Sequence, residues 1–213
     1  IVNGRSIRLT QERDPANLKW NEVGAEVVIE ATGLFLDQEG AGKHLAAGAK
    51  KVVISAPSKD DTPMFVFGVN HASYAGQAII SNASCTTNNA APMIKVIEEL
   101  CGIEQAYITT IHSFTTDQSL HDQPHKDLRR ARGASQSIVP TTTGAAKALT
   151  KIFTSLDGKM GGCGIRVPVP DGSLTDITFN VKQTVTIQEI NNAFMLASQT
   201  NLKGILEYTD DPI

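Results

Sequence analysis

Short apolar runs alternate with helix-like patterns in the first third of the chain. Runs rich in β-branched residues occupy 27–31, 51–56, 64–68 and 78–81, and the amphipathic segment 39–49 separates the first two. This alternation is typical of β–α–β units, which build a parallel sheet covered by helices. We therefore expect an α/β fold with a parallel sheet in this part of the chain.

The pattern changes after residue 85. The apolar runs become longer and alternate with threonine, as in LTDITFNV, which indicates a half-solvated and more antiparallel sheet. The expected strands lie near 106–111, 165–169 and 174–182. The expected helices lie near 88–101, 145–155 and 186–200.

This change of pattern predicts a domain boundary at residues 84 to 85. Residues 1–84 then form an α/β domain, and residues 85–213 form an α+β domain with a mixed, largely antiparallel sheet. Within the second domain, 117–139 has little periodicity and is long for a connection inside a compact domain. Such a loop is usually functional or lies at an interface.

The composition excludes several classes of protein. A chain of 213 residues with 41% hydrophobic content can bury a core, and a net charge of -3 gives no support for binding nucleic acid or an anionic membrane. Three cysteines form neither a disulfide framework nor a zinc-ligand set, so we expect a cytoplasmic protein without a metal site. We find no pattern of a membrane span or signal peptide. Ile1, followed by VNGRSIRL, does not resemble a translation start, which indicates a fragment.

The stretch SNASCTTNNAAPMIKVIEEL leads from a cysteine into an apolar, helix-like pattern. Because Pro92 is comfortable only in a first turn, the helix is predicted to begin between Cys85 and Pro92. Its candidate N-caps are Thr86, Thr87 and Asn88. The Cys85 sulfur would then lie at the positive end of the helix dipole, which lowers a thiol pKa and favours a nucleophilic thiolate. The alternative is a small buried hydrophobe, which is how we interpret Cys101 and Cys163.

His112 is the best candidate for a proton acceptor among the five histidines. It ends the strand pattern AYITTI and opens the polar turn HSFTTDQ, at a place where α/β proteins carry catalytic groups. A hydrogen-bonded structural histidine is the alternative. His44 is interpreted as a surface residue on a helix, and His121 and His125 belong to the long loop.

Three threonine-rich segments indicate anion binding. They are 84–87, 115–117 and 141–144, and the last of them precedes a helical pattern. Hydroxyls and backbone N–H groups at a helix start bind anions, phosphate especially. Arg166, in the strand IRVPVP, can add a bidentate contact. Together with Cys85, these residues indicate a thiol that works on a phosphorylated substrate.

Longer stretches around these residues resemble one known family. SNASCTTNNAAP, TTIHSFTTDQ, PHKDLRRARGASQSIVPTTTGAAKA and RVPVPDGSLTD are similar to consecutive segments of phosphorylating glyceraldehyde-3-phosphate dehydrogenase. QERDP, EATGLF, GAKKVVISAPSKD, FGVNH and KGILEYTDDPI extend the likeness over the whole chain, in order. The resemblance implies that residues 1–84 are the C-terminal part of a Rossmann-type NAD-binding domain. Residues 85–213 would be a catalytic domain truncated at its C-terminus.

The resemblance also implies roles for individual residues. Cys85 is the expected nucleophile, and His112 is the partner that activates it and handles the proton. The expected inorganic phosphate site is lined by Ser84, Thr86, Thr143 and Gly144. The expected site for the C3 phosphate of the substrate consists of Thr115 and Arg166, with Asp117 nearby. The expected contacts to the dinucleotide are Arg13, Thr32 and Ser55.

The implied activity is the oxidative phosphorylation of D-glyceraldehyde 3-phosphate to 1,3-bisphosphoglycerate, a step of glycolysis. It uses NAD as cofactor and inorganic phosphate as second substrate, through a cysteine thiohemiacetal and a thioester. Pro124 favours NAD over NADP. The loop 117–139 resembles the family's S-shaped loop at the tetramer core, which implies a homotetramer.

The chain also departs from the family's pattern. Asn89 stands where the family usually has a second cysteine, which takes no part in the chemistry. The family's glycine-rich loop, its ribose-binding acid and its nicotinamide-binding Asn have no counterpart in these residues, so turnover by this chain alone is not implied. The alternatives are erythrose-4-phosphate dehydrogenase, a non-catalytic fragment, and a cofactor-free thiol hydrolase that would cleave esters without NAD.

Overall fold

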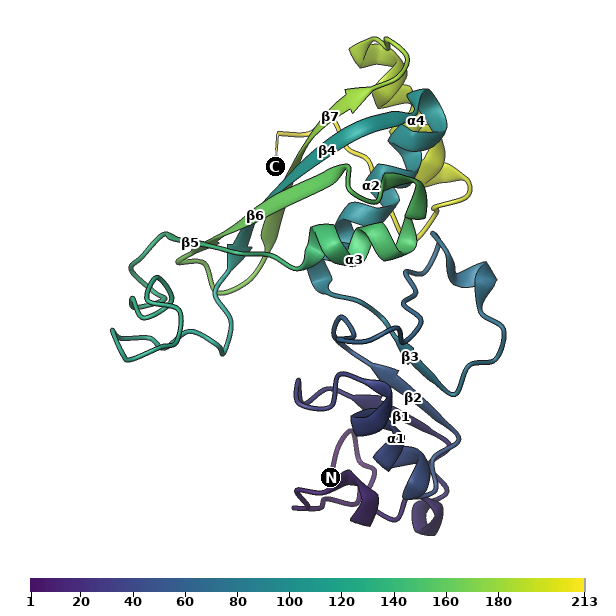
Figure 1. Ribbon diagram of the computed structural model, residues 1–213, viewed down its shortest axis with the longest axis vertical. Helices are drawn as coiled ribbons and strands as arrows, with labels where there is room; N and C mark the ends of the chain where they lie inside the picture. The colour runs from purple at the N-terminus through teal and green to yellow at the C-terminus, as the bar shows by residue number, and fades with distance from the viewer. Residues whose placement is uncertain (213) are drawn as a thin grey trace. The chain divides into compact units, whose positions relative to one another are not determined.

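The computed structural model describes residues 1–212, and the chain forms two compact units (Figure 1). Unit 1 comprises Ile1–Phe65 and Tyr74–Ala83. Unit 2 comprises Val66–Ser73 and the chain from Ser84 onward. The chain therefore contributes one short segment to unit 2 before it completes unit 1.

Unit 1 is built on a three-stranded parallel sheet. In spatial order its strands are β1 (Val27–Glu30), β2 (Lys51–Ile54) and β3 (Ile79–Ser81). Helix α1 (Gln38–Ala46) connects β1 to β2 and begins after Asp37, whose carboxylate accepts a hydrogen bond from Gly40 N at 2.7 Å. The short 3-10 helices η1 (Pro15–Asn17) and η2 (Trp20–Val23) precede β1. The parallel α/β sheet expected from the alternating pattern is confirmed.

The predicted strand at 64–68 is wrong. Met64 makes only an isolated parallel bridge to Ser81, and the chain then leaves unit 1. The Val66 N–H is taken by the side chain of Asn70, whose Oδ1 accepts it at 2.8 Å. Gly68 adopts φ +80°, a left-handed conformation that breaks an extended run. Local polar bonding therefore replaces a fourth strand, and the 3-10 helix η3 (His71–Ser73) follows.

The interpretation of His44 as a surface residue is also wrong. His44 lies on the face of α1 that packs toward the sheet, and it is only 4% exposed. The other buried residue of α1 is Ala41, which forms a core cluster with Val52 and Ile54. One ring nitrogen of His44 is hydrogen-bonded to the buried carboxylate of Glu30. This bond satisfies the polar ring inside unit 1.

Unit 2 contains a four-stranded mixed sheet. In chain order its strands are β4 (Ile103–Ser113), β5 (Val139–Thr141), β6 (Met160–Val167) and β7 (Ser173–Val181). They lie in the spatial order β5-β6-β4-β7. The β4–β6 pair is parallel, whereas β4–β7 and β5–β6 are antiparallel. The mixed, largely antiparallel sheet is confirmed.

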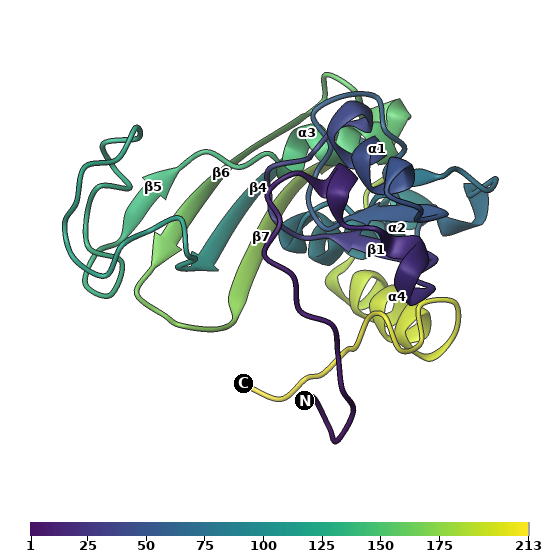
Figure 2. The ribbon, with the colours of Figure 1, turned by 90° about the horizontal axis from the view of Figure 1, so that it is seen from below.

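Three helices accompany this sheet, together with the short η4 (Thr154–Leu156). They are α2 (Cys85–Cys101), α3 (Ala145–Ile152) and α4 (Ile187–Gln199). Helix α2 packs against β4 and β7, and α3 packs against β6 and α2 (Figure 1). Figure 2 shows that the segment between β4 and β5 extends beyond the end of the sheet. The three predicted helices are thus present, with ends that differ by a few residues.

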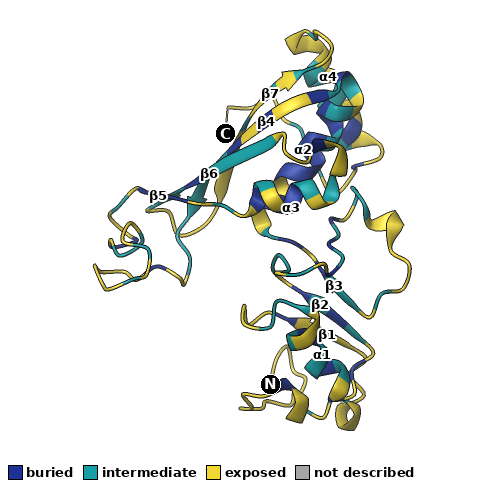
Figure 3. Cartoon of the chain, in the orientation of Figure 1, coloured by how far each residue is buried: buried dark blue, intermediate teal, exposed yellow. Residues whose placement is uncertain are grey.

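Alternation along β4 separates a covered from an open face of the sheet. Ala106, Ile108 and Thr110 are buried, whereas Tyr107 between them is exposed (Figure 3). Side chains two residues apart share a face, so His112 lies on the same face as the buried positions. This is the face that α2 packs against.

Helix α2 starts earlier than predicted. Its N-cap is Ser84, whose hydroxyl accepts a bond from Thr87 N at 3.1 Å, and its first residue is Cys85. The candidate caps Thr86, Thr87 and Asn88 are therefore wrong, because all three lie inside the helix. Pro92 is buried in the interior of α2, so the expectation that it lies in the first turn is also wrong. Proline has no backbone N–H and therefore removes one hydrogen bond from the helix.

Candidate active site

Cys85 is exposed at the first position of α2. The first backbone N–H groups of a helix point outward without helical partners and carry the positive end of its dipole. Ser84 satisfies one of them through its hydroxyl. The Cys85 thiol therefore lies where a negative charge is stabilised, whereas Cys101 is buried at the other end of the same helix. Burial, followed by the charge of Glu98, raises the pKa of Cys101.

His112 faces Cys85 across the site. Its Nε2 lies 3.2 Å from the Cys85 sulfur, within hydrogen-bonding distance. The two residues come from different elements, the start of α2 and the end of β4. The packing of α2 on β4 brings them together. The structure thus places the two predicted catalytic residues in contact, in the arrangement of a nucleophile beside a base.

The second ring nitrogen of His112 contacts Arg166. These residues are partners in the parallel β4–β6 register, so their side chains emerge next to each other. Arg166 Nη1 lies 2.6 Å from His112 Nδ1 and 2.8 Å from the carbonyl oxygen of Ser113. Nδ1 also lies 2.7 Å from the same carbonyl oxygen of Ser113. A guanidinium can only donate and a carbonyl oxygen can only accept, so the two contacts of Nδ1 favour opposite tautomers of the imidazole.

The environment of Arg166 carries both signs of charge. Burial, followed by the positive charge of Arg130, lowers the pKa of Arg166, while the negative charges of Cys85 and Asp117 act in the opposite direction. An arginine remains protonated despite such effects. Arg166 and Arg130 therefore form a pair of like charges at one site, which favours the binding of an anion.

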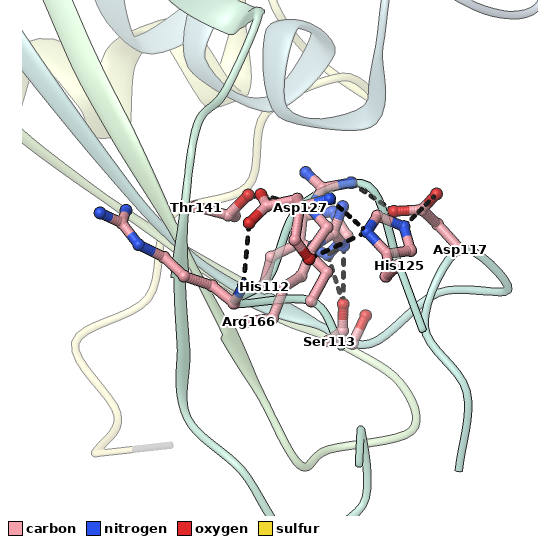
Figure 4. A network of polar contacts seen from close by, with 9 residues as sticks. His112, Ser113, Asp117, His125, Asp127, Thr141 and Arg166 are labelled. Carbon is pink, nitrogen blue, oxygen red and sulfur yellow. Dashed lines mark hydrogen bonds and ion pairs between the residues drawn. The ribbon is translucent and has the colours of Figure 1, made fainter. Parts of the chain in front are cut away.

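Asp117 is bound by partners that the sequence patterns did not indicate. Its carboxylate forms an ion pair with Arg130 and lies 3.6 Å from His125 Nε2. Arg130 Nε also donates to Thr141 Oγ1 at 2.9 Å. Figure 4 shows this network, with Asp117 and His125 at one end and Thr141 at the other. The hydrogen bond and charge of Arg130, opposed by burial and helped by His125, hold the pKa of Asp117 below its usual value.

Arg130 and His125 are thus functional candidates missed from the sequence. Both lie in the basic stretch HKDLRRAR, which resembles an ordinary solvated charge run. The available signal was a carboxylate, Asp117, in the same long loop as the four basic residues Lys126, Arg129, Arg130 and Arg132. Arg130 is only 21% exposed in its side chain, so it differs from the freely solvated arginines of that stretch.

The residues expected to bind inorganic phosphate lie at two helix starts. Thr86 is buried in the first turn of α2 next to Ser84 and Cys85. Thr143 Oγ1 accepts a bond from Ala145 N at 3.2 Å, at the start of α3. Gly144 is exposed, and no atom lies within 4 Å of the place where its Cβ would be. Helices α2 and α3 pack against each other within unit 2.

Thr115 and the unit 1 residues remain more open. Thr115 is half-buried two residues after the end of β4. Thr32 and Ser55 follow the adjacent parallel strands β1 and β2, and both are exposed. Ligands of open parallel sheets bind outside the carboxyl ends of the strands, so the structure brings these two residues to a suitable edge. Arg13 is exposed in the segment before η1.

Within residues 1–212, no helix is long and apolar enough to cross a membrane. In the same part of the chain, no cluster of three His, Cys, Asp or Glu side chains is placed to hold a metal ion.

The fold and site define a class of protein before any comparison. A parallel β–α–β unit is joined to a mixed-sheet unit that carries an exposed cysteine at a helix start, an imidazole in contact with its sulfur, and a pair of arginines. Such a class comprises α/β proteins with a nucleophilic thiol beside an anion site.

Comparisons with known proteins identify the family. The C-terminal domain of glyceraldehyde 3-phosphate dehydrogenase matches residues 84–213, and the NAD binding domain of the same enzyme matches residues 1–38. The glyceraldehyde-3-phosphate dehydrogenase of Serratia odorifera is 56% identical over 214 aligned residues, which cover 100% of this chain and 73% of that protein. The chain belongs to the glyceraldehyde 3-phosphate dehydrogenase family. The resemblance of its motifs to this family is thereby confirmed.

Other relatives agree and show how much of the protein the chain spans. The cytosolic glyceraldehyde-3-phosphate dehydrogenase of Leishmania mexicana is 55% identical, with 100% of this chain and 65% of that protein covered. Glyceraldehyde-3-phosphate dehydrogenase A of Escherichia coli strain K12 is 54% identical, with the same 100% and 65%. The chain thus spans about two thirds of the length of these relatives.

Proposed function

We propose that the protein containing this chain oxidises and phosphorylates D-glyceraldehyde 3-phosphate to 1,3-bisphosphoglycerate, with NAD as cofactor. The observation that carries the proposal is the contact of 3.2 Å between the Cys85 sulfur and His112 Nε2, in a chain of this family. The relatives described above are all named glyceraldehyde-3-phosphate dehydrogenases. Those names favour this substrate over erythrose 4-phosphate.

The first half of the reaction uses Cys85 and His112. The thiolate adds to the aldehyde carbon and forms a thiohemiacetal. His112 Nε2, at the sulfur, is placed to protonate the new alkoxide and later to remove the hydroxyl proton as the carbon is oxidised to a thioester. NAD supplies the hydride acceptor for this oxidation. Thr32 and Ser55, exposed at the carboxyl edge of a parallel sheet, fit a role in holding it.

The second half needs phosphate beside the thioester. Inorganic phosphate attacks the thioester carbon, and the Cys85 thiolate leaves, so that an acyl phosphate forms and no water is consumed. Ser84, Thr86, Thr143 and Gly144 are the proposed ligands of this phosphate, since backbone N–H groups at helix starts bind anions. Thr115 and Arg166, with Arg130 and Asp117 close by, are the proposed site for the C3 phosphate of the substrate.

The organisation of the whole protein follows the same proposal. Residues 1–84 would hold the cofactor and residues 85–213 would carry the chemistry. The loop 117–139 exposes Leu120, Leu128 and Ile138 by 62%, 82% and 70%, and large exposed apolar side chains favour a contact between subunits. We propose a homotetramer on this ground. A cytoplasmic location is supported by the Leishmania relative, which is named cytosolic.

The test compares the two aldehydes on three forms of the protein that contains this chain. We expect NADH to form when glyceraldehyde 3-phosphate, NAD and phosphate are all present, as measured by absorbance. With erythrose 4-phosphate as the aldehyde, we expect NADH to form much more slowly. Cys85→Ser should abolish NADH formation, whereas the matched control Cys163→Ser should retain it. Thiol labelling with iodoacetamide, read for each cysteine, needs no cofactor. If Cys85 labels no faster than Cys101 and Cys163, the proposed nucleophile is wrong.

A further inference from the structure

A buried chain of hydrogen bonds connects Trp20 to Thr32 in unit 1. His44, on α1, and Glu30, the last residue of β1, are 4% and 2% exposed. The Trp20 indole N–H donates to His44 Nδ1 at 3.1 Å, and His44 Nε2 lies 2.8 Å from Glu30 Oε2. The other oxygen, Glu30 Oε1, accepts the backbone N–H of Thr32 at 2.7 Å and also its hydroxyl.

The indole determines the direction of every bond in this chain. An indole N–H can only donate, so His44 Nδ1 accepts and the ring proton lies on Nε2. That proton is donated to Glu30. Burial is the largest single influence on Glu30 and raises its pKa, but the bonds from Thr32 and His44 together outweigh it and hold the pKa below the ordinary value. Glu30 is therefore ionised at neutral pH, and both its oxygens only accept.

The Thr32 hydroxyl is left with one open position. A hydroxyl offers one donor and two acceptor positions. The proton goes to Glu30, and one lone pair accepts the Leu34 N–H at 3.2 Å. Thr32 is exposed, so its second lone pair is available to a ligand at the carboxyl end of β1. A ligand bound there meets an acceptor and no donor.

We propose that Glu30 and His44 are positioning residues that hold the Thr32 hydroxyl as an acceptor, so that it binds an N–H or O–H group of the dinucleotide and not its phosphates. The inference rests on the proposed function, in which Thr32 contacts NAD, and it names the chemical part of NAD that Thr32 takes. Ribose hydroxyls, the carboxamide and the adenine amino group are donors of this kind. Phosphate oxygens are acceptors, and two acceptors without a proton between them repel each other.

Glu30→Gln tests the positioning role with almost no change of shape. The amide of Gln has one oxygen and one NH2 group. If the NH2 group points to His44, it faces the Nε2–H donor, and if it points to Thr32, it faces the donors of that residue. The variant must therefore reverse the His44 tautomer, which leaves the Trp20 N–H facing another N–H, or reverse the Thr32 hydroxyl. Glu26→Gln is the matched control, because Glu26 is exposed immediately before β1 and pairs at the surface with Lys50.

Two resonances report the outcome in ¹H–¹⁵N spectra. Trp20 is the single tryptophan of the 213 residues, so one indole N–H signal reports its bond to His44. We expect Glu30→Gln to shift this signal or the Thr32 amide, and Glu26→Gln to leave both in place. If both signals stay in place in a folded Glu30→Gln protein, the positioning role is overturned. Should Glu30→Gln fail to fold, Thr32→Val and Thr32→Ser test the same acceptor from its exposed end.

The ligand is tested by titrating the wild-type chain with NAD, adenosine, nicotinamide riboside and pyrophosphate. We expect NAD and at least one nucleoside to shift the Thr32 amide, and pyrophosphate to leave it unchanged. Thr32→Val should raise the Kd for that nucleoside about threefold to tenfold, and Thr32→Ser should keep the Kd of the wild type. The inference is overturned if pyrophosphate shifts the Thr32 amide signal, or if neither nucleoside shifts it. If NAD shifts the Ser55 signal but not the Thr32 signal, this inference is wrong while the proposed function stands. If NAD shifts neither signal, the proposed cofactor contacts are wrong as well.

Discussion

Arg166 Nη1 lies 2.6 Å from His112 Nδ1, on the side of the ring opposite the Cys85 sulfur. Ser113 offers its carbonyl oxygen to the same guanidinium at 2.8 Å and to His112 Nδ1 at 2.7 Å. Arg166 as a donor and Ser113 as an acceptor therefore place opposite demands on Nδ1. The guanidinium also brings a positive charge close to Cys85, and the two charges act on each other.

Replacing Arg166 should slow the labelling of Cys85. In Arg166→Met a positive charge that interacts with Cys85 is lost, so a thiolate there is less stabilised. We expect the rate of iodoacetamide labelling of Cys85 near neutral pH to fall about tenfold. Arg132→Met is the control, since Arg132 is 65% exposed and pairs with Asp122. An unchanged rate in Arg166→Met would show that the charge of Arg166 does not stabilise the Cys85 thiolate.

His112 should matter more for turnover than for folding. His112→Asn keeps a polar group but removes a proton acceptor and donor, and general acid–base catalysis contributes about 10² to 10⁴ in rate. We expect kcat for NADH formation to fall within that range while the thermal unfolding midpoint changes little, because His112 is only half-buried. His121→Asn, in the exposed part of the loop 117–139, should leave kcat unchanged. A loss of rate that follows a loss of folded protein would contradict a catalytic role.

Local patterns predicted the parts of the site that depend on one element. The position of Cys85 near a helix start follows from the helix-like apolar pattern that comes after it and from the capping residues between them, and His112 follows from the end of a strand pattern. The cap was misplaced by a few residues because Ser84, Thr86, Thr87 and Asn88 are all good caps, and propensity does not choose among them.

Contacts between distant elements were not predictable in the same way. Arg166 meets His112 because β4 and β6 pair in parallel at that register, and a one-residue slip would place the guanidinium on the other face. The buried His44 is hydrogen-bonded to Glu30, which lies on another element. Arg130 lies in a basic run, and its ion pair with Asp117 distinguishes it from the other arginines there. In each case the partner that decides burial lies far away in the sequence.

The Asp117–Arg130 pair should make the free energy of unfolding depend on pH in the acidic range. The pKa of Asp117 is lowered in the native state. Its contribution to stability is therefore fully present above the unfolded pKa of about 3.9 and is lost as the pH falls through the lower native pKa. We expect the difference in the free energy of unfolding between wild type and Asp117→Asn to shrink between about pH 5 and about pH 3, measured by urea denaturation.

The size of this effect should be modest and sensitive to salt. The Asp117 side chain is 45% exposed, so solvent and ions screen the pair. We expect the difference to stay below about 1 kcal/mol and to decrease further at high salt. Asp176→Asn, at an exposed position of β7, should leave the acid dependence unchanged. A difference that grows toward low pH has the wrong sign and would contradict the pairing.

Gly144 and Gly162 should respond to the same substitution in opposite ways. In Gly162→Ala the new Cβ would lie 2.8 Å from the carbonyl oxygen of Ile108, on the backbone of the neighbouring strand. Overpacking of this kind costs about 1–3 kcal/mol, so the unfolding midpoint should fall. Gly144 has no atom within 4 Å of such a Cβ, so Gly144→Ala should keep the stability of the wild type.

If inorganic phosphate approaches the backbone at Gly144, the free space there is the space that the anion uses. A methyl group at the start of α3 would then obstruct it, and the KM for phosphate in NADH formation should rise about tenfold. The KM for the aldehyde should change little, because Thr115 and Arg166 lie elsewhere in the proposed site. Equal KM values for phosphate in wild type and a stable Gly144→Ala would mean that the anion does not approach Gly144, and the proposed phosphate ligands would reduce to those at the start of α2.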